Sequence, residues 1–542
     1  MTLELTPRPD EGAVRVEVRV SGAPAREVRE LHVTRSWAGT KGAEAIGRIE
    51  VRDDLGDVPP GAGREDGGER IHALGRAPVG DLVVRYTARS GGARFGLRVI
   101  RDRMTGVGHG FLLLPRIEAP VPARIRWRLE ALGPGARGAS SFGEGDAAFT
   151  VTSGALAHAV YAAGALEGAA EGGERLVALG ARSIDAREAL AWTARVRALA
   201  AARFEGGAPA GGGAPFTVFL LGEPGIGEDH DGAFLGGAAG LWFDGGRRFD
   251  PQVRVALAHE LIHRHLGGDL QLLDDAGRPA AWFAEGFTVH YARKLLFDAA
   301  LITAEDFVAD VQRIDDEAAA ASGPRAAAPP FPLSTPPFPL SAPPFPAAAP
   351  PSPALLRADD RGAYFRGSRY AAHLDHALRR ASKGARSLDD LLRALRARGP
   401  APLRLADLRA ALDRELGAGA GADLDRVLDH EPLPPLPSGA YGPCFHRPKD
   451  RQPVFELGFD PESLDRAPSL IRGLLEGSAA EKAGLREGAL VLLAKRIPGP
   501  TDGPKAEVDI TIADRRGGKR IRYKPSAIRD IGRWRPRPCK RP

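Results

Sequence analysis

The run HELIH at residues 259–263 constrains the fold of this chain more than any other segment. It lies inside DPQVRVALAHELIHRHLGG, where Asp250 can cap a helix and Pro251 suits the first helical turn. The pair Gly267-Gly268 follows and can end the helix. The segment is therefore predicted to be one helix that begins after Asp250 and stops at the two glycines.

The two histidines of this run, His259 and His263, lie four residues apart, so on a helix both imidazoles can reach one zinc ion. Glu260 lies on an adjacent face, where its carboxylate can deprotonate a water whose pKa zinc lowers toward 7. A second expected helix, PAAWFAEGFTVHYARKLL from Pro279, presents Glu285 after 21 intervening residues. We predict one Zn2+ ion on His259, His263 and Glu285, with a fourth position open and Glu260 as the general base.

HELIH followed by WFAEGFTVHYA resembles the gluzincin peptidases, whose second motif typically reads W-[FL]-x-E-G-[FL]. Within that group the chain most resembles the glycyl aminopeptidase family, most strongly over residues 216–296 and in the C-terminal region. This resemblance implies an N-terminal β domain, a thermolysin-like catalytic domain and a C-terminal PDZ domain. It also implies a metallopeptidase that acts on a peptide or protein substrate.

A hydrolytic site also needs a donor for the developing oxyanion. Tyr364 is the candidate, because AYFRGSRYAAHL is similar to the Y-x-K-G pattern that carries the transition-state tyrosine in the aminopeptidase N superfamily. Arg366 stands where that pattern has lysine. A buried packing role for Tyr364 is the alternative, with Tyr370 as the second candidate donor.

The strand expected before the zinc helix, AFLGGAAGLWF, is predicted to be a sheet edge to which an extended substrate can add. Substrate contact is assigned to Gly236, Gly237 and Ala238. Gluzincin aminopeptidases usually carry a glutamate in this strand that binds the substrate α-amine, and none is present here. Aminopeptidase specificity therefore stays open. Three acids in the preceding turn could substitute for that glutamate: Glu228, Asp229 and Asp231.

Three domains are predicted, which makes the chain a multidomain α+β protein. Residues 1–150 are predicted to be all-β, because short alternating segments such as Val14–Val20 are separated by Gly, Pro and Asp. From about Gly154 apolar residues recur at helical spacing, so residues 151–430 are predicted to be mainly helical, with a strand at Phe216–Leu221. The family resemblance implies that this region is the thermolysin-like catalytic domain. Residues 450–542 are expected to form the third domain.

The catalytic domain contains a proline-rich insertion at residues 323–354, with repeats PPFPLST, PPFPLSA and PPFPAAA. Proline at this density lacks amide donors and favours polyproline II, so the insertion is predicted to be an exposed spacer. Docking of its PxxP spacing into an aromatic groove is the alternative. Helices should resume afterwards, with Ser387 and Asp390 as a capping box, and a proline cluster at 432–437 marks a boundary.

The C-terminal region contains PVFELGFDPESL and SAAEKAGLREGA, which resemble a PDZ domain. The turn Leu457-Gly458-Phe459 matches the Φ-G-Φ loop whose amides can capture a peptide C-terminus. Ala489 stands where the bacterial SPAxxAGLxxGD signature has aspartate. A closed structural tail that binds no peptide is the alternative.

The net charge of +6 is concentrated at residues 515–542, which carry twelve Lys or Arg and one acid. Such runs are usually solvated faces, so no nucleic-acid partner is expected. No stretch approaches the roughly 18 consecutive apolar residues of a transmembrane helix, so no membrane span is expected. The first ten residues do not resemble a secretory signal. A cytoplasmic location is therefore expected, with a periplasmic or secreted one as the alternative if a signal peptide was removed.

The two cysteines, Cys444 and Cys539, allow at most one disulfide bond and leave the redox compartment open. Taken together, the motifs predict a zinc metallopeptidase that hydrolyses peptide bonds. The rival interpretation is a catalytically weak or inactive peptide-binding scaffold that uses the peptidase fold and the PDZ module. The missing strand glutamate motivates this rival, whereas the intact base Glu260 speaks against it.

Overall fold

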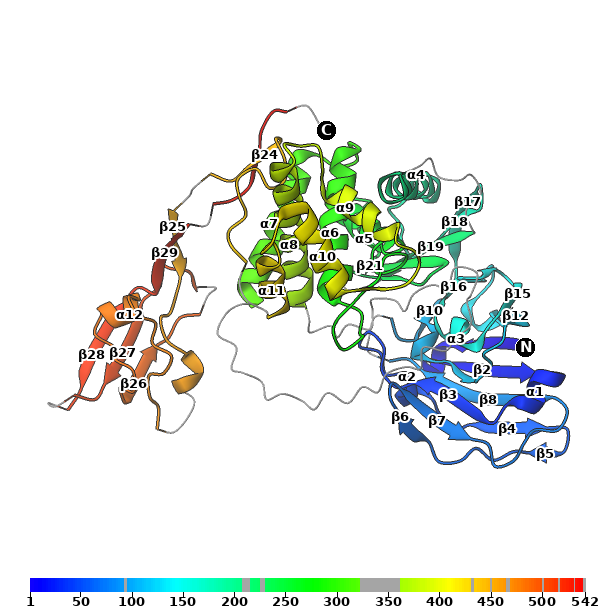
Figure 1. Ribbon diagram of the computed structural model, residues 1–542. Helices are drawn as coiled ribbons and strands as arrows, with labels where there is room; N and C mark the ends of the chain where they lie inside the picture. The colour runs from blue at the N-terminus through cyan, green and yellow to red at the C-terminus, as the bar shows by residue number, and fades with distance from the viewer. Residues whose placement is uncertain are drawn as a thin grey trace. The chain divides into compact units, whose positions relative to one another are not determined.

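The structure is a computed structural model, and the residues it describes are 1–91, 95–206, 215–224, 230–321, 361–429, 433–448, 451–464, 468–499, 502–514, 517–530 and 532–539. The chain divides into two units, one of Met1–Asp310 with Leu333–Leu436 and the other of Val311–Pro332 with Pro437–Arg541. In Figure 1 the first unit has a β-rich part, in blue and cyan, and a helical part, in green and yellow.

The N-terminal strands form because apolar and polar residues alternate along them, which buries one face of each strand. Strands β2 (Ala13–Val20) and β8 (Leu82–Arg89) pair antiparallel, with Val16 opposite Tyr86 in the core. The sheet that contains this pair has the strand order β15 (Ala148–Val151), β12 (Val121–Trp127), β1 (Thr2–Arg8), β2, β8, β4 (Glu50–Asp53), β5 (Gly56–Asp57). A second sheet has the order β14 (Gly143–Glu144), β13 (Arg137–Ser140), β16 (Val160–Gly164), β10 (Arg103–Val107), β9 (Arg98–Ile100). A third has the order β11 (Leu113–Pro115), β3 (Glu30–Thr34), β7 (Glu69–Ala73), β6 (Arg64–Asp66). Two short helices accompany them, α1 (Ala23–Glu27) and α2 (Gly42–Ala45).

The expectation that helices begin near Gly154 is wrong for the next 25 residues or so. After the short helix α3 (Ser153–Ala157) the chain forms β16, β17 (Leu166–Glu171) and β18 (Glu174–Leu179). Strand β16 is buried at every position, because it lies between β13 and β10. A strand buried on both faces shows no polar alternation, so its alanines could not be distinguished from a helix by periodicity.

The catalytic part is built on a five-stranded sheet of order β17-β18-β19-β21-β20. Strand β19 (Phe216–Glu223) confirms the predicted strand, is buried throughout and pairs parallel with β18 and β21 (Ala238–Asp244). The described helices that follow or flank this sheet are α4 (Ala186–Glu205), α5 (Pro251–Ile262), α6 (Ala281–Asp298), α7 (Ala304–Ala321), α8 (Arg361–Ala381), α9 (Leu388–Arg396), α10 (Leu405–Leu416) and α11 (Ala422–Leu428). A short parallel pair, β22 (Leu272–Leu273) and β23 (Leu403–Arg404), links two of the loops.

The single edge strand predicted over AFLGGAAGLWF is wrong, because the segment folds as a hairpin. Strand β20 (His230–Phe234) pairs antiparallel with β21, and Leu235 N donates to Ala238 O at 2.7 Å to close the turn between them. Gly236, with φ of +68°, occupies this turn together with Gly237. Two glycines between short apolar runs are a hairpin signal. Strand β20, and not β21, is therefore the edge of the sheet.

Helix α5 confirms the predicted cap, since Val253 N donates to Asp250 Oδ1 at 3.0 Å. The helix ends at Ile262, earlier than the glycine pair. Gly267, with φ of +86°, instead serves a turn in which its N–H donates to Leu270 O at 3.0 Å. The capping box at Ser387 and Asp390 is present at the start of α9. The proline-rich insertion lies outside the described residues.

The C-terminal unit contains a sheet of β26 (Val491–Arg496), β27 (Val508–Ile512) and β28 (Lys519–Tyr523). Two further pairs are β24 (Phe445–His446) with β30 (Arg535–Pro536) and β25 (Arg451–Phe455) with β29 (Ser526–Asp530). In the described part of residues 437–541, the α-helix is the short α12 (Ala479–Lys482), and η5 (Pro461–Leu464) is a 3-10 turn. Cys444 and Cys539 form a disulfide bond.

The described part of the basic C-terminal run is folded into this unit. Tyr523 is mostly buried and its hydroxyl donates to Leu457 O at 2.5 Å, while Trp534 is 3 % exposed and packs edge-on against Tyr441. Arg520 pairs with Asp509 on the neighbouring strand. Throughout the described residues, every helix is too short or too polar to cross a bilayer.

Candidate metal centre

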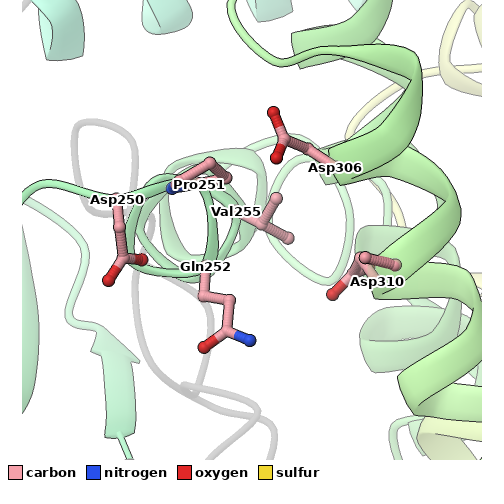
Figure 2. Close-up of a pocket in the computed structure, with 7 residues that line it drawn as sticks. Asp250, Pro251, Gln252, Val255, Asp306 and Asp310 are labelled. Atoms are coloured by element: carbon pink, nitrogen blue, oxygen red, sulfur yellow. The ribbon is translucent and has the colours of Figure 1, made fainter.

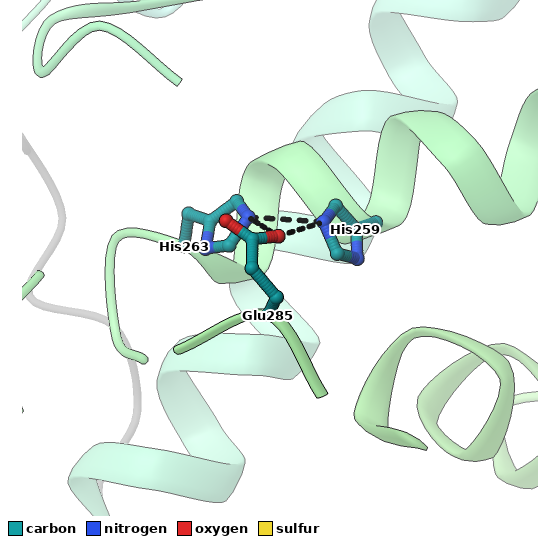
Figure 3. Close-up of side chains that lie close together, drawn as sticks. All are labelled: His259, His263 and Glu285. Atoms are coloured by element: carbon teal, nitrogen blue, oxygen red, sulfur yellow. Dashed lines mark hydrogen bonds and ion pairs between the residues drawn. The ribbon is translucent and has the colours of Figure 1, made fainter. Parts of the chain in front are cut away.

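Three donor atoms converge from two helices (Figure 3). Nε2 of His259 lies 3.0 Å from Nε2 of His263, both on or at the end of α5. Oε2 of Glu285, on α6, lies 3.1 Å from the first of these nitrogens and 3.3 Å from the second. A tetrahedral zinc ion with ligands at about 2.0 to 2.1 Å separates them by roughly 3.3 Å. The donor set and its spacing therefore fit one zinc ion.

The electrostatics of these three residues also favour a cation. Burial alone would raise the pKa of Glu285, but the two imidazoles outweigh it and hold that pKa below its ordinary value. Burial lowers the pKa of His263, whereas the carboxylate of Glu285 more than offsets this and raises it to about 9. Burial and the charge of His263 lower the pKa of His259. An ionised buried carboxylate beside two imidazoles is a site in which positive charge is stabilised.

A hydrogen bond orients the ring of His263. Its Nδ1 lies 3.2 Å from Leu266 O, to which it donates when that nitrogen carries the proton. This bond leaves the lone pair of Nε2 directed at His259 and Glu285, as in metal sites where the far ring nitrogen is held by a carbonyl. The turn after α5 therefore fixes the second histidine of the motif.

Glu260 is 7 % exposed and its side chain lies against the edge strand β20 at Gly232. The N–H of Phe234 on β20 donates to its carboxylate, and a Cβ added to Gly232 would lie 2.6 Å from its Cδ. Burial, with the nearby charges of Glu285 and Asp231, raises the pKa of Glu260 to about 8. Strand β20 can therefore approach this carboxylate closely only because residue 232 is glycine.

Tyr364, on α8, lies beside the same group. Its hydroxyl donates to the carboxylate of Glu285, and its ring stacks on His259 with 6.0 Å between centroids and 20° between planes. Burial and the charges of Glu285 and Glu260 raise its pKa well above the ordinary value, so the hydroxyl keeps its proton. Tyr370 lies elsewhere, with its ring 5.7 Å from that of Trp282.

The residues predicted to contact substrate lie in the hairpin turn and in β21 rather than on the edge strand. Gly236 and Gly237 form the turn, and Ala238 is fully buried between β19 and β20. The sequence did not single out Gly232, and it offered Asp231 only as one of three alternatives. Both residues are on β20, and the one sequence feature that indicates this strand is the glycine pair of the hairpin turn that follows it.

Two other histidines near the motifs lie outside the centre. His290 is buried on α6. His265 belongs to a second group with Glu205 and Asp269, in which each residue offers a ligand atom within 4.8 Å of the others. Arg396 already stands in this group, with Nη2 2.9 Å from Asp269 and Nη1 3.3 Å from His265 Nδ1. We call these four residues the Arg396 cluster.

A pocket of about 280 Å³ opens between the start of α5 and α7 (Figure 2). Val255, one helical turn before His259, lies in its wall. The carboxylates that line the pocket already have partners. Asp250 caps α5, Asp306 accepts from Thr303, and Asp310 pairs with Arg293 at 3.2 Å. The pocket therefore lies beside the first turns of α5, and the carboxylates that line it are already paired.

The Φ-G-Φ turn of the C-terminal unit is part of its core. Leu457 and Phe459 are 9 % and 3 % exposed, and Gly458 has φ of +86°. Gly458 O accepts from Leu475 N at 2.9 Å. A side chain at this glycine would also meet Ala480 and Ser478 at the start of α12. The glycine is required by conformation and by space.

The chain shares its fold with an aminopeptidase N family protein from Idiomarina loihiensis, at a TM-score of 0.65 and 13% identity over 98% of this chain and 97% of that chain. An M1 zinc metallopeptidase from Deinococcus radiodurans aligns at 0.47 and 20% identity, over 80% of this chain and 94% of that one. Yeast LTA4 hydrolase aligns at 0.48 and 11% identity, over 80% and 68%. No protein-family model and no curated protein matches the chain.

Proposed function

We propose that this chain is a zinc-dependent metallopeptidase of the HExxH gluzincin type that hydrolyses peptide bonds. The observation that supports this most is the convergence of His259 Nε2, His263 Nε2 and Glu285 Oε2 within 3.3 Å of one another. Three protein ligands leave a fourth position on the metal, which distinguishes catalytic from structural zinc sites. We also propose that it is related to the glycyl aminopeptidase family, which its motifs resemble.

Each neighbouring residue has one role in this proposal. Zinc, when bound, supplies a Lewis acid that polarises the scissile carbonyl and lowers the pKa of water. Glu260 accepts the proton of the attacking water and delivers it to the leaving amine. Tyr364 donates a hydrogen bond to the oxygen that becomes negatively charged. Strand β20 holds the extended substrate by main-chain hydrogen bonds.

The variant Glu260→Gln tests the catalytic role. It is expected to keep the zinc content of the wild type and to lower kcat by about 10²- to 10⁴-fold, because the base is lost while the ligands stay. Zinc is measured by atomic absorption and turnover with a peptide library, with Glu205→Gln as the matched control. A wild type that binds zinc but cleaves nothing would favour the peptide-binding scaffold.

For specificity, we propose that Asp231 binds the free α-amine of the substrate, in place of the missing strand glutamate. Asp231 is on the edge strand, next to Gly232, whose backbone lies against Glu260, and its negative charge helps to raise the pKa of both Glu260 and Tyr364. Asp231→Asn should raise KM for free peptides and leave that for N-acetylated peptides unchanged. Equal cleavage of free and acetylated peptides by the wild type would exclude aminopeptidase specificity.

For the C-terminal unit, we propose a PDZ-like domain that takes a peptide C-terminus at Leu457-Gly458-Phe459. The positive φ of Gly458 and the helix α12 that packs on it support the motif. Binding of fluorescent peptides with free and amidated C-termini to the full chain tests it. Equal affinity for both would exclude capture of a carboxylate.

For the compartment, the disulfide between Cys444 and Cys539 supports the periplasmic or secreted alternative over the cytoplasm, because such bonds persist in oxidising environments. Thiol labelling of the protein in its own cells tests this. Detection of two free thiols would instead indicate a reducing compartment.

A further inference from the structure

Helices α6 and α8 touch at two glycines, Gly286 and Gly367. A Cβ added to Gly286 would lie 2.5 Å from the carbonyl carbon of Gly367 and 2.6 Å from Ser368 N. A Cβ added to Gly367 would lie 2.7 Å from the carbonyl carbon of Trp282 and 2.8 Å from Gly286 Cα. Neither glycine has a positive φ. Lack of space between the two backbones, and not turn conformation, therefore requires glycine at both positions.

Both glycines lie inside helices, where glycine costs about 1 kcal/mol relative to alanine. Their neighbours in sequence indicate what this contact achieves. Gly286 directly follows Glu285, and Gly367 lies three residues after Tyr364, on the same face of α8. The point where the helices touch is therefore one helical turn or less from the carboxylate and the hydroxyl that are hydrogen-bonded to each other.

Side chains beyond the glycines hold the helices at this separation. Arg293 of α6, 1 % exposed, donates to Ser368 Oγ, next to Gly367. Tyr370 of α8 packs edge-on against Trp282 of α6, with 5.7 Å between ring centroids. The contact is thus secured by a buried hydrogen bond on one side and aromatic packing on the other.

We propose that Gly286 and Gly367 are positioning residues, whose contact sets how far the Tyr364 hydroxyl reaches toward the reacting carbonyl. This inference rests on the proposed peptidase function. A methyl group at either glycine pushes α8 away from α6 and withdraws Tyr364, while the three metal ligands, which are on α5 and α6, keep their places. A displacement of about 1 Å at a catalytic group can cost 10²-fold in rate.

The test is a double-mutant cycle of Gly367→Ala with Tyr364→Phe in the zinc-loaded full chain. Gly367→Ala should lower kcat about 10- to 100-fold with KM and zinc content close to wild type, and should add nothing in the Tyr364→Phe background. Binding of a phosphinic pseudotripeptide, measured by calorimetry, should follow the same pattern without turnover. Equal losses in both backgrounds, or no loss, would overturn the proposal.

Two further variants separate position from stability. Ala292→Gly destabilises α6 by about 1 kcal/mol without adding an atom at the contact, and should leave kcat unchanged. If Gly367→Ala does not fold, Ser368→Ala loosens the same contact and should weaken phosphinate binding about 3-fold, again only when Tyr364 is present. A loss that does not depend on Tyr364 would contradict the inference. A wild type that neither cleaves peptides nor binds the phosphinate would instead refute the proposed function.

Discussion

The metal centre and the Arg396 cluster contain the same kinds of side chain, yet only one of them has room for a metal ion. In the centre, two imidazoles and a carboxylate face one another across 3.0 to 3.3 Å. In the cluster, a guanidinium already lies 2.9 Å from Asp269 and 3.3 Å from His265. The difference is that the first group directs its donor atoms at one common point, whereas the second already surrounds a guanidinium.

His263 of the centre and His265 of the cluster are only two residues apart, and their pKa values move in opposite directions. Burial lowers the pKa of both, but the carboxylate of Glu285 raises that of His263 to about 9. Burial together with the charge of Arg396 lowers that of His265 to about 3. Proximity in sequence to HExxH therefore says nothing about ligation, because the partner across the fold decides it.

The most direct test of which group binds the metal is to remove one carboxylate from each group. Glu285→Ala is expected to lower zinc affinity by at least roughly 100-fold, because it removes a ligand, and loss of a residue that only orients a ligand already costs roughly 10- to 100-fold. Glu205→Ala should leave zinc affinity and content unchanged. Competition with a chromogenic chelator measures both. If the two variants lost zinc equally, the assignment of the metal to the first group would be wrong.

A pair of imidazoles without a carboxylate partner, far from the metal centre, tests the same principle that the neighbouring group decides the pKa of a buried histidine. His109 Nε2 lies 3.1 Å from His158 Nδ1 in the β-rich part, and Thr34 Oγ1 lies 2.8 Å from His109 Nδ1. Burial lowers the pKa of His158 to about 4, and burial together with the charge of His158 lowers that of His109 to about 3. Both rings are therefore neutral in the folded protein at pH 5.

Because the unfolded chain binds these protons below about pH 6.5, stability should fall as pH drops from 6.5 toward 4. Each ring should cost about 2 kcal/mol at pH 5 relative to pH 7. His158→Asn removes one titrating group, so urea unfolding should depend less on pH by about that amount. His72→Asn, at a partly exposed position, is the control. An unchanged pH dependence in His158→Asn would contradict burial of a neutral pair.

The local motifs predicted which side chains converge better than they predicted the fold around them. The spacing of HELIH and the helix cap at Asp250 depend on interactions within one helix, so the sequence alone was sufficient. The strand β16 was missed because its partners on both sides come from distant segments, and burial on both faces removes alternation. Gly232 was missed because its significance lies in the approach of Glu260, which no periodicity encodes.

The contact between Gly286 and Gly367 illustrates the same limit. Both glycines lie in motifs whose charged and aromatic members carry the recognisable chemistry, and a glycine within a helix has no functional group of its own. Their role depends on the distance between helices that are separated by the proline-rich insertion in sequence. Only the fold brings α6 and α8 into contact.

The smallest expected effect comes from a substitution within the Arg396 cluster. Arg396→Met removes the cation, so His265, Glu205 and Asp269 are left with ligand atoms within 4.8 Å of one another. Stability should fall by only about 1 kcal/mol, because the guanidinium and both carboxylates are about one-third exposed. A second, weaker zinc equivalent should appear in titrations.

The matched control for this change is Arg393→Met, one turn earlier on the same helix, which removes an ion pair with Asp390 instead. It should cost a similar amount of stability and add no zinc. If Arg396→Met still bound a single zinc ion, the guanidinium would not be what separates the two groups. The reason would then have to be the placement of the cluster carboxylates, Glu205 and Asp269. It would have to differ from that of Glu285, whose Oε2 lies within 3.3 Å of both imidazoles of the centre.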